Sequence, residues 1–246
     1  MLRNMYTITV LLLPVLSQYK SGIPKITIGD LLLIFNTILL FMIISVKSYD
    51  IKIRMRTIVK NPFFWLFVYI ILGTMLSCLT QYQVVIVEIM GSSMRFIFYM
   101  FCACVVSGIL FDFNYFIRQY KKLVIFATLF LILQIFLFYF TNYELSGVIP
   151  CLENVQNRPT KAIIQYSSSS AFYRPSSIFL EPGYYAQYVL PYLAYLLFYK
   201  NISHRFVKAS ILTFACMLST SGQGIIISFI IWVLYFIHDI YISFKK

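Results

Sequence analysis

The stretch "LVIFATLFLILQIFLFYF", Leu123–Phe140, decides the fold class. It contains no charged residue, and its residues with hydrogen-bonding side chains are Thr128, Gln134 and Tyr139. An apolar run of about 17–25 residues is long enough to cross a bilayer as a helix. A polar side chain in the middle of such a run needs a partner, and we expect Gln134 to hydrogen-bond to a neighbouring helix.

The rest of the chain repeats this pattern. Of its 246 residues, 61% are hydrophobic and 11% charged, whereas soluble domains have about 45–50% and about 25%. We therefore predict an all-α polytopic membrane protein with a single transmembrane domain, residues 1–246, of about eight helices. The predicted spans are about 4–19, 26–46, 62–80, 90–110, 123–141, 183–199, 209–220 and 224–242.

The basic residues predict the orientation. With the N-terminus in the cytoplasm, 14 of the 20 Lys and Arg residues fall on the inner side, as the positive-inside rule requires. They are Arg3, Lys47, Lys52, Arg54, Arg56, Lys60, Arg118, Lys121, Lys122, Lys200, Arg205, Lys208, Lys245 and Lys246. This arrangement predicts that both termini are cytoplasmic. It also accounts for the net charge of +12 without a nucleic-acid partner.

One long loop, about residues 142–182, is predicted to lie outside. Most other connections are much shorter, and long loops are usually functional or disordered. A flexible spacer is one reading of this loop. The aromatic and turn-forming residues of its second half favour a functional segment. The five cysteines and two histidines show no metal-ligand spacing, so we expect no metal and no other cofactor.

The candidate chemistry lies at the end of this loop. Arg174 presents a planar fork of donors suited to a phosphate, although an interfacial arginine can also reach lipid headgroups. Glu181 precedes Pro182, so it is either the N-cap of the next helix or a carboxylate that contacts a sugar hydroxyl. Tyrosines then recur on one helix face, which we expect to line a polar cavity. Those at the candidate site are Tyr184, Tyr188 and Tyr192.

Two further features belong to the candidate site. Arg95 lies inside the fourth predicted span, where a charge by default marks a functional position, and Glu88 is one potential partner. Ser221 and Gly222 belong to "LSTSGQG", Leu218–Gly224, which predicts a tight turn between two spans. The acids Asp30 and Asp239 stand near span ends, and we interpret them as capping or snorkelling residues.

Two strings together resemble the O-antigen polymerase/ligase family of bacteria: "RPSSIFLEPGYYAQYVLPYL", Arg174–Leu193, and "LSTSGQGIIISF", Leu218–Phe229. The residues that match the family patterns are Arg174, Phe179, Glu181, Pro182, Ala186, Ser219, Ser221, Gly222 and Gly224. Ser177 stands where many members have glycine, and the Ser/Gly turn lacks the arginine often found there. Members are commonly longer and carry a second outward loop with basic residues. By this resemblance we expect a short variant of the family, a product truncated at the C-terminus or one piece of a split protein.

The resemblance implies a function. The most similar members look like polymerases of oligosaccharide repeat units for capsule, exopolysaccharide or O-antigen. They act on the outer face of the bacterial cytoplasmic membrane and are inverting glycosyltransferases with an undecaprenyl-pyrophosphate-linked donor. Arg174 and Glu181 would then be catalytic. Arg95, Tyr184, Tyr188, Tyr192, Ser221 and Gly222 would bind substrate.

The expected partners are the lipid-linked oligosaccharide, membrane lipids and other polysaccharide-assembly proteins. Two alternatives stay open: a transporter or flippase of the lipid-linked glycan, and a non-catalytic membrane subunit of a polysaccharide assembly complex. The absence of an obvious inverted repeat counts against a transporter.

Overall fold

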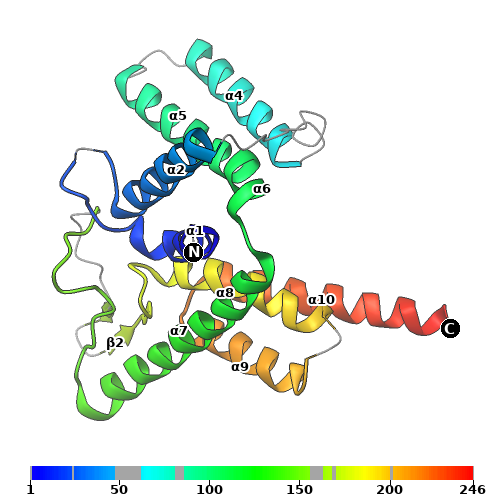
Figure 1. Ribbon diagram of the computed structural model, residues 1–246. Helices are drawn as coiled ribbons and strands as arrows, with labels where there is room; N and C mark the ends of the chain where they lie inside the picture. Colours follow the sequence, from blue (N-terminus) through cyan, green and yellow to red (C-terminus); the bar gives the residue numbers. More distant parts are fainter. Residues whose placement is uncertain are drawn as a thin grey trace. The chain divides into compact units, whose positions relative to one another are not determined.

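A computed structural model describes residues 2–23, 25–47, 62–80, 86–155, 163–167, 170–199 and 202–245 (Figure 1). Over these ranges the chain is helical except for one small hairpin and the connections. The helices are α1 (Leu2–Leu16), α2 (Ile28–Lys47), α4 (Pro62–Thr80), α5 (Ile86–Phe101), α6 (Ser107–Leu110), α7 (Phe113–Thr141), α8 (Pro182–Phe198), α9 (Arg205–Leu218) and α10 (Gly222–Phe244). A π-helical turn, η1 (Cys102–Val106), joins α5 to α6.

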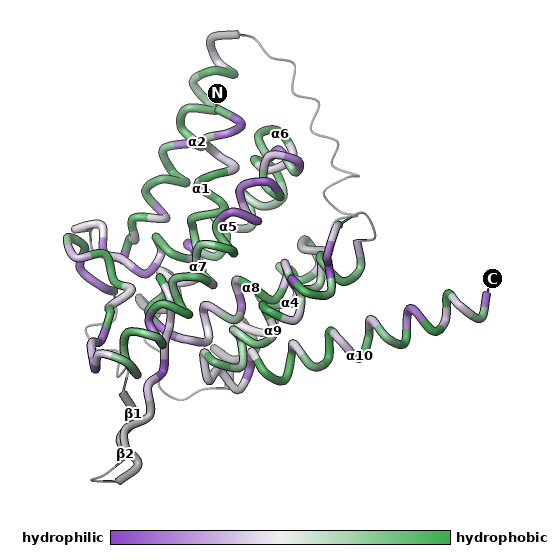
Figure 2. Tube along the Cα trace, turned by 90° about the horizontal axis from the view of Figure 1, so that it is seen from below, coloured by the Kyte–Doolittle hydropathy of each residue, from purple (hydrophilic) through white to green (hydrophobic). Residues whose placement is uncertain are grey.

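The helices confirm the predicted fold class, an all-α polytopic membrane protein. Each of the eight hydrophobic segments corresponds to a helix, and 90–110 comprises α5, η1 and α6 together. Four helical stretches of the described chain are long and apolar enough to cross a membrane: Ile28–Ser45, Gly91–Leu110, Phe113–Thr141 and Gly222–Phe244. Figure 2 shows hydrophobic residues along most of α2 and α7.

Within Leu123–Phe140 the outward side chains of α7 are mostly apolar, which is typical of a helix facing lipid. Leu129 and Phe140 are 61% and 74% exposed. The polar residues Thr128 and Gln134 lie instead on the buried side of the same helix. This reverses the arrangement of a soluble amphipathic helix, in which the apolar stripe faces the core.

The chain divides into two compact units. Unit 1 comprises residues 1–13 and 21–116, and unit 2 comprises residues 14–20 and 117–246. The core of unit 1 gathers around Tyr6 of α1, Leu33 and Leu40 of α2, and Cys102 and Val106 of η1. Tyr6 donates a hydrogen bond of 2.9 Å to the carbonyl of Cys102, which gives its buried hydroxyl a partner.

Unit 2 is built around α8. Ten of the 17 residues of this helix are buried. It runs parallel to α10, since Ala186 lies at Gly224 and the Phe198 ring lies 5.9 Å from that of Tyr235. It runs antiparallel to α7, where the hydroxyls of Thr128 and Tyr185 are 3.2 Å apart.

The long loop, predicted to be irregular, contains an antiparallel hairpin of β1 (Ile163–Ser167) and β2 (Ser170–Tyr173). Residues 153–155 of the loop also pair through their backbone with the segment after α1. The amide of Lys20 donates to the carbonyl of Glu153 at 2.8 Å, and that of Val155 to Gln18 at 2.9 Å. In the described parts of the loop, a purely flexible spacer is therefore ruled out.

The expectation for Gln134 was wrong. Its side chain bonds the loop and not another helix: Nε2 donates to the carbonyls of Leu145 at 2.9 Å and Ser177 at 3.2 Å, and Oε1 accepts from the amide of Ser177 at 2.9 Å. The physical reason is that non-helical backbone lies against α7. The peptide groups of this backbone need hydrogen-bond partners, and the Gln134 side chain provides them.

Candidate functional site

The sequence-predicted site residues fall into two groups. Arg174, Glu181, Tyr184, Tyr188, Tyr192, Ser221 and Gly222 belong to unit 2, and Arg95 belongs to unit 1.

Arg174 follows directly after β2 and precedes Pro175. Its side chain is half-buried and makes no hydrogen bond or ion pair with any residue that the structure describes. A guanidinium carries five N–H donors in a fixed fork, so one without protein partners is available to an anion.

Tyr173, the neighbour of Arg174, is buried at 3% exposure and stacks on Phe138 with ring centroids 4.4 Å apart. Burial, and secondarily the carboxylate of Glu144, raises the pKa of Tyr173 to about 12. The stacked ring of Tyr173 fixes the backbone just before Arg174.

Glu181 is the N-cap residue of α8, with extended backbone at φ −136° and ψ 147°, as the following Pro182 predicts. Its side chain makes no capping hydrogen bond and is exposed. The carboxylate is thus not used in capping. Among the residues that the structure describes it has no side-chain partner, so it can accept a hydrogen bond from a ligand at the start of α8.

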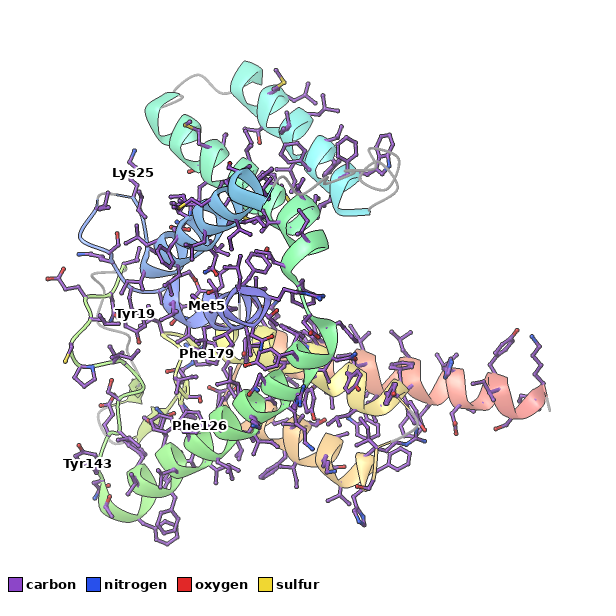
Figure 3. All side chains as sticks on the ribbon, in the orientation of Figure 1. Met5, Tyr19, Lys25, Phe126, Tyr143 and Phe179 are labelled. Atoms are coloured by element: carbon purple, nitrogen blue, oxygen red, sulfur yellow. The ribbon has the colours of Figure 1, made fainter. Side chains whose placement is uncertain are left out.

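The segment Ser176–Leu180 connects these two charged residues and is largely buried. Ser177 has φ 57°, a left-handed conformation that favours glycine. Its hydroxyl donates to the carbonyl of Ala127 in α7 at 2.6 Å. Phe179 lies in the interior of unit 2 (Figure 3), 5.2 Å from the ring of Tyr188.

The tyrosine face of α8 differs from the expected polar cavity. Tyr184 lies at the surface, but Tyr188 and Tyr192 are only 8% and 4% exposed. Their rings pack edge-on against Tyr120 of α7, at 5.3 and 5.6 Å, and Tyr120 donates a hydrogen bond to the carbonyl of Tyr188. The rings therefore form part of an aromatic cluster between α7 and α8.

The predicted turn between the last two spans is confirmed. α9 ends at Leu218 and α10 begins at Gly222. Ser221 is the buried N-cap of α10, and its hydroxyl accepts a hydrogen bond from the amide of Gly224 at 3.2 Å. Gly222 is exposed on the first turn, where backbone N–H groups have no partner within the helix.

The N-terminal turns of α8 and α10 are in close contact. A Cβ atom on Gly224 would lie 2.8 Å from the Cβ of Ala186, so only glycine allows this approach. Beside this contact, the side-chain amide of Gln187, one residue after Ala186, donates through Nε2 to Oε1 of Gln223, one residue before Gly224, at 3.2 Å. The N-terminal part of α8, which follows Glu181, therefore lies beside the N-terminal turn of α10. Aligned helix N-termini favour bound anions.

In unit 1, Arg95 pairs with Asp30. Its guanidinium lies 2.9 Å from the carboxylate, and it also donates to Thr27 and Tyr99. Asp30 accepts from the amide of Thr27 at 2.8 Å, which confirms its predicted capping role. The side chain of Glu88, the partner that the sequence suggested, lies outside the described part of the chain.

Sequence reasoning missed the pairing of Asp30 with Arg95 because it considered Glu88 as the partner of Arg95 and interpreted Asp30 as a capping or snorkelling residue. The available signal was that two opposite charges both lie in apolar spans, where charges usually pair. It also missed the role of Gln18, discussed below, for which the sequence carries no signal.

Comparison with protein-family models, with curated proteins and with solved structures finds no match to this chain.

Proposed function

We propose that this protein polymerises oligosaccharide repeat units linked to undecaprenyl pyrophosphate, yielding a capsule, exopolysaccharide or O-antigen. It would be an inverting glycosyltransferase of the bacterial cytoplasmic membrane, with its site on the outer face and both termini in the cytoplasm. The proposal starts from the resemblance of two strings to the O-antigen polymerase/ligase family.

One observation carries the proposal furthest: the two strings meet in space. They are separated by α9 in the sequence, yet Ala186 of the first contacts Gly224 of the second. Both residues belong to the matched patterns. A chance likeness of two separate strings gives no reason for their small residues to meet, so the contact supports a shared site.

The conformation of Ser177 adds support. Many members of the family have glycine at this position, and here the residue has φ 57°. A residue with a side chain is uncommon in this region, and glycine adopts it without strain. Ser177 therefore has the backbone conformation that glycine favours. The hydrogen bond from its hydroxyl to the carbonyl of Ala127 supports this conformation.

Arg174 is suited to the leaving group. In the proposed reaction an acceptor hydroxyl oxygen attacks the anomeric carbon from the face opposite the pyrophosphate. The bond from that carbon to the pyrophosphate oxygen breaks, and negative charge develops on the departing lipid pyrophosphate. Arg174, which has no partner among the described residues, would stabilise this charge.

Glu181 is suited to the acceptor. A carboxylate that caps nothing with its side chain can accept a hydrogen bond from the attacking hydroxyl and orient it. It is also the candidate to take the proton as the new bond forms. Ser221, Gly222 and Tyr184 lie on the adjoining helix turns and would contact the sugars or the phosphates.

The test is Arg174→Ala in the native host. Removing one electrostatic stabiliser of the transition state typically costs about 100- to 1,000-fold in rate. We expect loss of long polymer and accumulation of single lipid-linked repeats, seen by gel electrophoresis of the glycans. Arg118→Ala, at an exposed arginine of α7, is the control.

Other outcomes distinguish the alternatives. Normal chain lengths in Arg174→Ala would refute the proposed catalytic role. Repeats trapped on the cytoplasmic side when the gene is deleted would identify a flippase. Wild-type polymer in the Arg174→Ala, Glu181→Ala double variant, with loss of polymer on deletion, would identify a non-catalytic subunit.

A further inference from the structure

The segment Ser176–Leu180 lies against the middle of α7. Ala127, which accepts the hydrogen bond from the Ser177 hydroxyl, is the central residue of Phe113–Thr141. At about 1.5 Å of rise per residue, each end of α7 is about 21 Å away. The whole of α7 is one of the helices able to cross a membrane. Ser177 is thus far from the end of α7 at which the long loop begins.

Non-helical backbone at such a level needs hydrogen-bond partners from the protein, because lipid offers none. Two buried glutamines provide them. Gln134, 1% exposed, bonds both the amide and the carbonyl of Ser177. Gln18, 7% exposed, accepts from the amide of Leu180 at 2.7 Å.

The start of the long loop packs closely against the other side of this segment. A Cβ atom on Gly147 would lie 1.6 Å from the carbonyl oxygen of Ser177, so the start of the loop passes directly over that peptide. Nε2 of Gln134 also donates to Leu145, two residues before Gly147. Gln134 therefore hydrogen-bonds both the start of the loop, at Leu145, and its end, at Ser177, to α7.

We propose that Ser176–Leu180 is a re-entrant segment, held against the middle of α7 by Gln134 and Gln18, and that Gln134 is a positioning residue for Arg174 and Glu181. The catalytic consequence rests on the proposed function, whereas the re-entrant geometry does not. Arg174 and Glu181 flank the segment, so a clamp on Ser177 fixes the distance between the two charges. Displacement of a reacting group by about 1 Å can cost about 100-fold in rate.

The geometry is tested by cysteine labelling in membranes. Leu180→Cys is placed in a chain whose native cysteines are replaced, and its reaction with a membrane-impermeant maleimide is timed. A chain that keeps only the exposed Cys151 is the reference for a labelled loop position. We expect slow labelling at position 180 and fast labelling at position 151.

Gln134→Met keeps the length of the side chain and removes its hydrogen bonds. We expect it to raise the labelling rate at position 180 about tenfold, because buried peptide groups lose their partners. Gln119→Met, the matched control on the same helix, should leave the rate unchanged. Ser177→Gly keeps the backbone bonds to Gln134 and suits φ 57°, so labelling should stay slow.

The positioning role is tested with purified protein and a lipid-linked repeat unit, per amount of folded protein. Gln134→Met should lower the turnover rate about 100-fold with little change in KM, since displaced charges weaken the transition state more than substrate binding. A loss of folded protein alone would lower neither value.

The outcomes separate the two proposals. Equal labelling of position 180 in Gln134→Met and its parent would overturn the clamp. Faster labelling with unchanged turnover would overturn the positioning role. If the parent makes no polymer at all, the proposed function fails, and the labelling experiment still tests the re-entrant segment.

Discussion

Asp30 and Arg95 show how a buried charge is made tolerable in an apolar helix pair. The Asp30 carboxylate accepts hydrogen bonds from Thr27 and Tyr99 as well as from Arg95. Its side chain is only 6% exposed, whereas that of Arg95 is 37% exposed. The carboxylate is therefore the group that depends on the pair, and the arginine is the group that could also meet a ligand.

Asp30→Ala should destabilise the protein. Breaking a buried pair costs about 3–5 kcal/mol, and the partial exposure of Arg95 reduces our expectation to about 2–3 kcal/mol. The measurement is the thermal unfolding of detergent-solubilised protein, with the exposed Asp239→Ala as control. If Asp30→Ala left stability unchanged, the pair would not support the fold. A loss of polymer in Arg95→Ala at full stability would indicate substrate binding.

Tyr173 predicts a pH dependence at the alkaline end. Its pKa is raised from 10.0 to about 12 in the folded state, chiefly by burial. Between these values the unfolded chain loses the phenolic proton and the folded chain keeps it, so stability falls as pH rises through this window.

The measurement compares the parent with Tyr173→Phe by denaturant unfolding between pH 9 and pH 12. We expect the parent to lose stability more steeply above about pH 10, the unperturbed pKa of tyrosine, and the two slopes to agree below it. Parallel curves across the whole range would contradict the assignment.

At the scale of the element, the close pair is α8 and α10. Small residues let helix backbones approach closely in membranes. Ala186 and Gly224 do so here, at the N-terminal turns that bear the candidate site. Two parallel helices in contact near their N-termini also align their dipoles. In the proposed reaction these dipoles would stabilise the negative charge on the leaving pyrophosphate.

Gly224→Ala should therefore separate the two helices. The added Cβ atom would lie 2.8 Å from that of Ala186, and such overpacking costs about 1–3 kcal/mol. Gly224→Ala combined with Ala186→Gly should recover most of the loss, because it restores the space. The measurement is thermal unfolding.

Gly183→Ala is the control for this pair of variants. No atom lies within 4 Å of a Cβ atom on Gly183 outside its own neighbours, so stability should be equal or higher. A failure of the double variant to recover would show that the contact at Ala186 is not the cause.

For the whole molecule, the orientation of the chain is the prediction that matters most for function. A reporter enzyme that is active only on the outer side of the cytoplasmic membrane should be inactive when fused after Lys245. The same reporter should be active when inserted within residues 142–155. A reporter fluorescent only in the cytoplasm should give the reverse pattern. The opposite result at both positions would invert the topology, place the candidate site on the cytoplasmic side and contradict the proposed function.

Much of the architecture followed from local sequence features. Charge-free runs such as Leu123–Phe140 predicted the membrane class and the helices, because burying backbone polar groups in lipid leaves the helix as the available structure for such a run. Pro182 predicted Glu181 at the N-cap of α8, and the Ser/Gly run predicted the turn before α10. These features depend on residues a few positions apart.

What only the tertiary structure decided is the partner of each polar side chain. Gln134 and Ser177 are 43 residues apart, and Asp30 and Arg95 are 65 apart, so no local pattern links them. The tyrosine face of α8 meets Tyr120 and not a cavity for the same reason. By itself the sequence determined that the chain is a helical membrane protein with a charged string before α8. Contacts between residues far apart in the sequence determined which buried polar groups hold that string in place. Each buried polar group needs a hydrogen-bond partner, and the fold decides which groups come within reach of one another.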